Sequence, residues 1–206
     1  MRRNILMLSF ILWLVTFAAY ATNQASKKID TLYITDFGLK PNSKINSVLP
    51  VRNAIKQIKP GIETVLIFPK GQYDFWPIND FEKGYFESNT SDINPKRLGI
   101  LFENLKGVTL DGDGSSFVFH DRIQPITIEK SQNIFIKNLS IDWEFPLTAQ
   151  AEILKVSDQF IDVYIDKSQY PFEIVDGKII FAAEGWKGGI SAVMELEKES
   201  NLIAYN

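Results

Sequence analysis

The feature that most constrains the fold of this chain is a repeat of strand-like segments at a fixed interval of 26 residues. The segment 99–110 aligns without gaps on the segment 125–136, so that Val108 matches Ile134. Each copy is a short alternating strand, a polar turn and a second short strand, and none of these strands can bury much surface alone. A fixed period in the twenties is typical of stacked solenoids, in which each repeat covers its neighbour. The pattern therefore favours a parallel β-helix with one repeat per coil over a β-sandwich whose strand spacing is coincidental.

In such a coil, alternate side chains point into the core. The inward positions that we expect are the apolar residues Val108, Leu110, Ile134, Ile136, Leu139 and Ile141. Asp111 and Asp142 then point outward. A solenoid leaves its first coil open, and we expect an amphipathic helix at about 47–59, capped by Asn46 or Ser47, to cover it. Residues 77–97 are polar and rich in turn-forming residues, which predicts a long loop.

Residues 149–183 have a different pattern, with alternating strands separated by Ser157-Asp158 and Asp176-Gly177. Tight polar turns of this kind are typical of antiparallel hairpins. One more strand is expected at Ala192–Leu196. The predicted fold class is therefore all-β, an incomplete right-handed parallel β-helix with a short N-terminal capping helix and an antiparallel β insertion. The expected divisions are a signal peptide at 1–21, coils at 22–148, the insertion at 149–190 and a return strand at 191–206.

The first 21 residues have the pattern of a secretory signal peptide. Arg2 and Arg3 precede an apolar run, and the Ala19-Tyr20-Ala21 sequence provides a cleavage site before a polar segment. The alternative is an uncleaved membrane anchor, because an apolar run of about 17 residues nearly spans a bilayer. We expect cleavage, export to the periplasm or the exterior of a bacterial cell, and no stable membrane insertion afterwards. An exported chain without disulfides fits a bacterial envelope protein.

Composition excludes several kinds of function. Cysteine is absent, which excludes disulfides, thiol catalysis and cysteine-ligated metal sites. His120 is the single histidine, so one chain cannot form a histidine-pair zinc site. The 22 basic and 25 acidic side chains give a net charge of −3 without a basic stripe, which argues against nucleic acid as a partner. The segment Asp111–Ser115 fails the calcium-loop pattern at Ser116 and Arg122, so a turn is expected there. No metal and no cofactor are predicted.

Several motifs of the mature chain resemble known proteins. The segment Asp36–Pro41, a short helix and the segment Val65–Tyr73 together resemble the opening of pectin-lyase-like right-handed β-helix proteins. Four further motifs, in this order, resemble those of bacterial α-1,3-galactosidases of glycoside hydrolase family 110: Ser88-Asn89 with Asn94–Arg97, Leu110–His120, Ile141–Glu144, and Pro146 with Gln150-Ala151. The resemblance covers roughly residues 30 to 206.

This resemblance implies an exported, inverting exo-α-1,3-galactosidase, whose partners are carbohydrates, namely glycans with terminal α-galactose. Members of that family are much longer than this chain. The resemblance therefore implies that the chain is the N-terminal part of such an enzyme, that the catalytic carboxylates lie in later coils, and that the chain alone is inactive. It identifies no catalytic residue here.

Inversion requires a carboxylic acid and a carboxylate about 6.5–9.5 Å apart. Asp142 and Glu144 are the local candidates for catalysis, and His120 and Trp143 are the candidates for substrate binding, because an acidic pair beside an indole can face a sugar. The simpler interpretation is structural: Asp142 caps a turn, Trp143 covers a coil edge and His120 makes internal hydrogen bonds. Two alternative functions remain, a non-catalytic β-helix that binds glycans or serves as a surface module, and a relative of polysaccharide lyases.

Overall fold

The computed structural model describes residues 28–86 and 94–204, so the expected signal peptide lies outside the described residues. In chain order the elements are β1 (Ile29–Tyr33), η1 (Ile34–Phe37), α2 (Val48–Ile55), β2 (Glu63–Ile67), β3 (Gln72–Phe75), β4 (Glu82–Lys83), β5 (Lys96–Glu103), β6 (Lys106–Phe119), β7 (Gln124–Glu129), β8 (Gln132–Trp143), β9 (Glu152–Val156), β10 (Ile161–Tyr164), β11 (Phe172–Val175), β12 (Lys178–Ala183) and β13 (Trp186–Gly189). Among the described residues, no helix has the length and apolar character needed to cross a bilayer.

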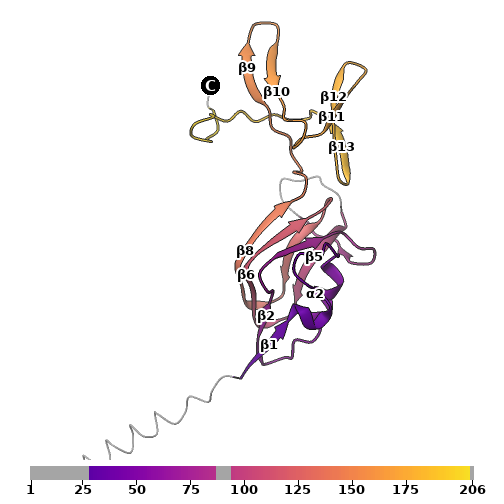
Figure 1. Cartoon of the computed structure of the whole chain (residues 1–206), viewed down its shortest axis with the longest axis vertical. Helices are drawn as coiled ribbons and strands as arrows, with labels where there is room; N and C mark the ends of the chain where they lie inside the picture. The colour runs from indigo at the N-terminus through magenta and orange to yellow at the C-terminus, as the bar shows by residue number, and fades with distance from the viewer. Residues whose placement is uncertain (1–27, 87–93, 205–206) are drawn as a thin grey trace, which may run out of the picture.

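Parallel strands stacked in successive coils form the first part of the molecule (Figure 1). Strands β1, β2, β6 and β8 pair in parallel, and β3 also pairs with β6. A second parallel sheet contains β5 and β7. β6 bends between Asp111 and Ser115, so its first half pairs with β2 and its second half pairs with β3. Each coil therefore has three faces, and the all-β fold with parallel coils is confirmed.

The strand register confirms the 26-residue repeat as the length of one coil. Val108 pairs with Ile134 between β6 and β8, and Ile100 pairs with Ile126 between β5 and β7. Beyond the bend in β6 the register shifts. The segment Asp111–Ser115, predicted as a turn, does not reverse the chain. It is a corner inside one long strand, formed because Asp113 and Gly114 both have positive φ values.

The core lies between the three faces and contains an aromatic column. Phe75 stacks on Phe119, with ring centroids 4.8 Å apart, and Trp143 follows at 5.8 Å from Phe119. The first spacing is that of neighbouring strands in a sheet. Of the predicted inward residues, Val108 and Leu110 are fully buried, and Ile134 and Leu139 pack against the core. Ile136 and Ile141 remain 36% and 43% exposed, because no described strand covers β8 on its other side.

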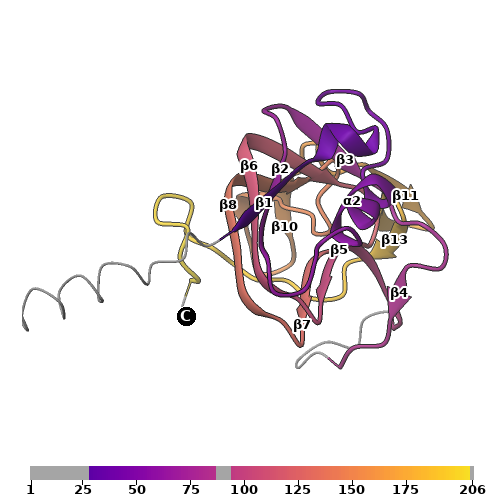
Figure 2. The same ribbon diagram turned by 90° about the horizontal axis from the view of Figure 1, so that it is seen from below.

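Helix α2 covers the first coil on the side of β5, as Figure 2 shows. Its apolar face is fully buried at Val48, Val51 and Ala54. The helix is shorter than predicted: the Lys56 amide still donates to the Arg52 carbonyl four positions earlier, but the Gln57 and Ile58 amides each donate to the carbonyl three positions earlier, as in a tighter turn. The cap is provided by Asn46, whose Oδ1 accepts from the Val48 amide at 3.1 Å, while the Ser47 side chain makes no capping bond.

The antiparallel strands lie at the end of the β-helix away from β1 (Figure 1). β9 pairs with β10, and β11, β12 and β13 form a three-stranded antiparallel sheet, which confirms the predicted antiparallel pairing. The expected strand at Ala192–Leu196 is wrong. Between 191 and 204 the structure has only an isolated bridge between Leu196 and Ile203, because no described strand lies alongside to pair with this exposed segment.

Candidate functional site

The predicted catalytic candidates lie at the end of β8, on the last described coil. Asp142 is exposed and aligned with outward-facing Val118, and its Oδ1 accepts from the Trp143 amide at 2.8 Å. Glu144 is also exposed, and its backbone amide continues the ladder by donating to the Phe119 carbonyl. The two carboxylates therefore lie on the outward side, separated by one inward residue.

Trp143 has a packing role in this structure. Its register with Phe119 places it in the inward aromatic column, and its Nε1 is buried without a hydrogen-bond partner. The indole therefore packs against the end of the core. It does not form a platform beside Asp142 and Glu144.

His120 lies in a polar group that we call the junction cluster, consisting of Asp74, Trp76, His120 and Glu184. Asp74 is in β3, Trp76 and His120 directly follow β3 and β6, and Glu184 is in the turn between β12 and β13. The His120 ring stacks on the Trp76 indole, with centroids 3.8 Å apart and planes 17° apart. The cluster therefore joins two coils of the β-helix to the antiparallel sheet.

Both ring nitrogens of His120 contact carboxylates. Nδ1 lies 2.7 Å from Oε2 of Glu184, and Nε2 lies 3.2 Å from Oδ1 of Asp74. The Trp76 Nε1 donates to the other oxygen of Glu184 at 2.9 Å. With His120 only 5% exposed and both ring nitrogens in contact with carboxylates, the residue presents no free nitrogen to a sugar in this arrangement. Its geometry is that of an internal hydrogen-bonding residue.

The junction cluster rests on a closely packed base. Asp74 is 1% exposed, and its Oδ1 also accepts from Gln72 at 2.9 Å and lies 3.6 Å from the Lys44 ammonium. Its Oδ2 is buried without a partner. Asp121 lies beside the cluster and binds Arg97 through two hydrogen bonds of 2.8 and 2.9 Å. Burial alone would raise the pKa of Asp121, but hydrogen bonds from Arg97 and the Arg122 amide outweigh it and lower that pKa.

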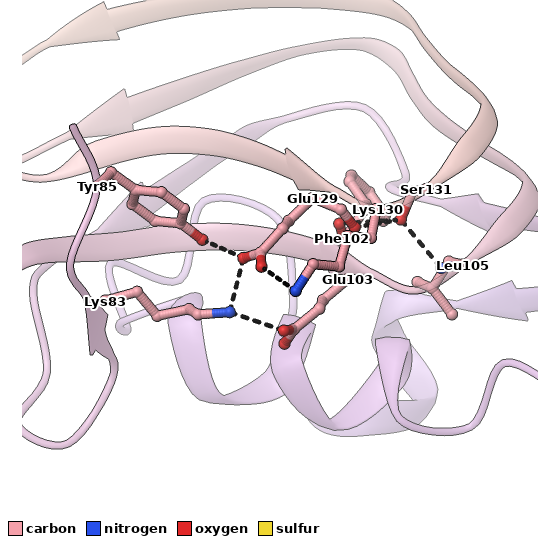
Figure 3. Close-up of polar contacts among 8 residues, drawn as sticks. All are labelled: Lys83, Tyr85, Phe102, Glu103, Leu105, Glu129, Lys130 and Ser131. Carbon is pink, nitrogen blue, oxygen red and sulfur yellow. Dashed lines mark hydrogen bonds and ion pairs between the residues drawn. The ribbon is translucent and has the colours of Figure 1, made fainter. Parts of the chain in front are cut away.

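A second polar group, the carboxylate ladder, lies on the outward face of β5 and β7 and consists of Lys83, Tyr85, Glu103 and Glu129 (Figure 3). Glu103 pairs with Glu129 in the register of neighbouring coils. The Lys83 ammonium lies between them, donating to Glu103 at 2.7 Å and to Glu129 at 2.6 Å. The Tyr85 hydroxyl also donates to Glu129 at 2.6 Å. Two carboxylates directly opposite each other on neighbouring strands repel, and the Lys83 ammonium between them offsets this repulsion.

The contacts of the ladder fix its ionisation. Hydrogen bonds from Lys83 and Tyr85 lower the pKa of Glu129 to about 2. The hydrogen bonds to Glu103 and Glu129 raise the pKa of Lys83. The pKa of Tyr85 is raised mainly by burial and, to a smaller extent, by its hydrogen bond to Glu129. A general acid in an inverting glycosidase needs a carboxyl with a raised pKa. Glu129 is held ionised instead, so the ladder is suited to holding the coils together and is not suited to donating a proton to a leaving group.

Sequence reasoning did not identify either polar group as a whole. The 26-residue repeat did contain a signal for the ladder, because it aligns Glu103 with Glu129. It contained no signal for Lys83 or for the junction cluster, since Glu184 lies 64 residues from His120 and 108 from Trp76.

Comparisons with known proteins match most of this chain. The family described as GLAA-B beta-barrel domain I matches residues 149–206. "Alpha-1,3-galactosidase B" of Bacteroides thetaiotaomicron is 42% identical over 182 residues, which are 88% of this chain and 29% of that protein. "Alpha-1,3-galactosidase A" of Bacteroides fragilis is 32% identical over 92% of this chain and 32% of its own length. "Alpha-1,3-galactosidase A" of Shewanella woodyi is 33% identical over 84% of this chain and 28% of its own length.

The chain thus spans less than a third of the length of these curated relatives. The similarity agrees with the resemblance indicated by the motifs between Ser88 and Ala151, and it covers both the parallel coils and the antiparallel strands. Over most of its own length, this chain is therefore similar to one part of the bacterial α-1,3-galactosidases.

Proposed function

We propose that this chain is part of an exported glycoside hydrolase that removes terminal α-1,3-linked galactose from glycans with inversion. The names of the relatives support this reaction class and a carbohydrate substrate. We further propose that the chain alone has little or no activity, because the acid and base are contributed by coils beyond those described. The pattern of residues 1–21 supports export to the periplasm or the exterior of a bacterial cell as part of this proposal.

The structural observation that supports the second part of this proposal, further coils beyond those described, is the uncovered side of β8. Ile136 and Ile141 belong to the inward columns, yet they are 36% and 43% exposed, and β8 pairs only with β6 among the described strands. A solenoid buries such a face by adding another coil. A further coil on β8 would also extend the outward column of Asp142 and Glu144 at the usual strand spacing of about 4.8 Å. Carboxylates two coils apart, at about 9.6 Å, then fall near the separation that inversion requires.

A chimera tests the reaction class. The matching part of the Bacteroides thetaiotaomicron relative is replaced by this chain, and release of galactose from a terminal α-1,3-galactoside is measured. We expect the chimera to retain turnover with inversion, observed by NMR of the first-formed anomer. A folded chimera without turnover would contradict the proposal. The same chimera with Asp142→Asn and Glu144→Gln shows whether this outward pair contributes.

The purified 206-residue chain tests the second part. We expect no turnover of the same galactoside above that of its Asp142→Asn, Glu144→Gln double variant. Robust turnover that the double variant loses would refute inactivity of the isolated chain. Saturable sugar binding without hydrolysis, retained in the double variant, would instead favour a non-catalytic glycan-binding module.

A further inference from the structure

We propose that the Glu184-Gly185 turn is a latch that fixes the antiparallel sheet β11–β13 on the β-helix, with Trp76, His120 and Asp121 as its receptor. This inference is independent of the proposed function. The chain itself connects the β-helix to the antiparallel strands through residues 144–151, which follow β8. The latch is a second, non-covalent connection, made by the two-residue turn between β12 and β13 to positions that directly follow β3 and β6.

The receptor presents two ring nitrogens, one from Trp76 and one from His120, to one carboxylate. Trp76 and His120 come from consecutive coils, and the His120 amide continues the strand ladder by donating to the Phe75 carbonyl at 3.0 Å. This backbone register, together with ring stacking at 3.8 Å, holds the indole and the imidazole side by side. Each oxygen of Glu184 then takes one ring nitrogen, at 2.9 Å from Trp76 and 2.7 Å from His120. Two-point contact of this kind fixes direction as well as distance.

The far side of His120 prevents the ring from turning away. Its Nε2 contacts Oδ1 of Asp74, which is buried and is further held by Gln72 and faced by Lys44. Both partners of the imidazole are carboxyl groups, and an ionised carboxylate can only accept a hydrogen bond. Both contacts are therefore hydrogen bonds at the same time only if both ring nitrogens carry a hydrogen, or if one carboxyl group is protonated. The ring therefore connects Asp74 in β3 to Glu184 in the turn between β12 and β13.

Gly185 shows that the turn is seated closely against the β-helix. Its φ is +74°, and a Cβ built on it would lie 1.5 Å from Oδ1 of Asp121. The Asp121 carboxylate cannot move aside freely, because Arg97 binds both of its oxygens and the Arg122 amide donates to Oδ1. Only glycine therefore fits at this point of contact.

The connection is polar and partly open to water, which is typical of a latch and not of a continuous core. The Glu184 side chain is 34% exposed, and β9 and β10 are exposed along their whole length. A polar junction that is partly open to water permits relative motion unless specific contacts prevent it. Removing the contacts of Glu184 or the space at Gly185 should therefore release the sheet without unfolding the β-helix.

The absence of cysteine makes a distance measurement direct. Spin labels are placed on the full chain at Thr31→Cys in β1 and Lys178→Cys in β12, both exposed positions, and distances are measured by double electron–electron resonance. We expect one narrow distance distribution for the labelled parent and loss of that single peak in Glu184→Gln and in Gly185→Ala. Glu173→Gln is the matched control, because Glu173 is an exposed acidic residue of the same sheet whose carboxylate lies 3.8 Å from the ammonium of exposed Lys187.

The single histidine supplies a second readout, since ¹⁵N spectra of a histidine-labelled chain contain one imidazole. The Nδ1 signal of His120 should shift in Glu184→Gln and stay unchanged in Glu173→Gln, while circular dichroism shows that both variants remain folded. A narrow, unshifted distance distribution in both Glu184→Gln and Gly185→Ala would overturn the proposal, whatever the imidazole signal does. An unchanged Nδ1 signal in Glu184→Gln would overturn it equally, because the contact would then not exist in solution.

Discussion

The coil spacing places the Glu129 carboxylate next to that of Glu103. Hydrogen bonds from Lys83 and Tyr85 stabilise the ionised form of Glu129. Its lowered pKa, about 2 against an ordinary 4.5, means that the folded chain favours the ionised form. Its contribution to stability is therefore fully present above about pH 4.5 and is lost as the pH falls toward 2. We expect the stability difference between the parent and Glu129→Gln to be constant near neutral pH and to shrink over that acid range.

Urea unfolding at a series of pH values measures this difference. Glu173→Gln is again a suitable control, because Glu173 and its partner Lys187 are both exposed, so the corresponding difference should be small at every pH. A difference between the parent and Glu129→Gln that does not change between pH 5 and 3, a span of about two units, would show that the ladder does not hold Glu129 ionised.

The coils approach so closely that one strand of the second sheet must contain a glycine. A Cβ on Gly99 in β5 would lie 2.7 Å from the Pro125 carbonyl oxygen and 2.9 Å from the Phe119 ring. Gly188 in β13 has no such neighbour within 4 Å and no positive φ. We expect Gly99→Ala to lower the free energy of unfolding by about 1–3 kcal/mol through overpacking, and Gly188→Ala to change it by about 0.5 kcal/mol or less. Equal effects of the two substitutions on chemical denaturation would contradict this account of coil spacing.

At the scale of the whole molecule, the uncovered side of β8 should make the isolated 206-residue chain self-associate. Inward residues such as Ile141 are exposed there, beside a strand edge with no partner among the described residues. Unpaired edges with apolar side chains favour association with other chains. Sedimentation velocity should show concentration-dependent association that Ile141→Lys reduces. Leu154→Lys, at an exposed residue of β9, is the control and should leave association unchanged. A strictly monomeric parent at high concentration would contradict the expectation.

Much of the fold could be predicted because its physical causes are local or periodic. The repeat determines which strands stack, since a 26-residue coil brings Val108 beside Ile134. The Asp176-Gly177 pair predicts a hairpin because these residue types readily adopt the positive φ values that the turn needs, and both residues have them in the structure. The prediction of a strand at Ala192–Leu196 was wrong because its cause is neither local nor periodic. Apolar alternation permits a strand, but a strand forms only where another backbone is present to pair with it.

The candidate residues divide in the same way. The repeat correctly placed Asp142 on the outward face of its coil, because orientation along a strand follows from alternation. Whether Asp142 and Glu144 take part in catalysis stays a prediction. The partners of His120 could not be predicted, because Asp74 and Glu184 are brought to it from opposite directions by the stacking of coils and by the return of a distant hairpin.

The sequence by itself determined the solenoid period, the antiparallel hairpins and the similarity to one part of the α-1,3-galactosidases, since each depends on residues in a fixed order along the chain. Only the tertiary structure decided that Glu184 meets Trp76 and His120, and that Lys83 lies between Glu103 and Glu129. The physical reason is that such side-chain contacts depend on distances of about 3 Å between groups far apart in the chain. Composition and periodicity do not specify those distances until the backbone is folded.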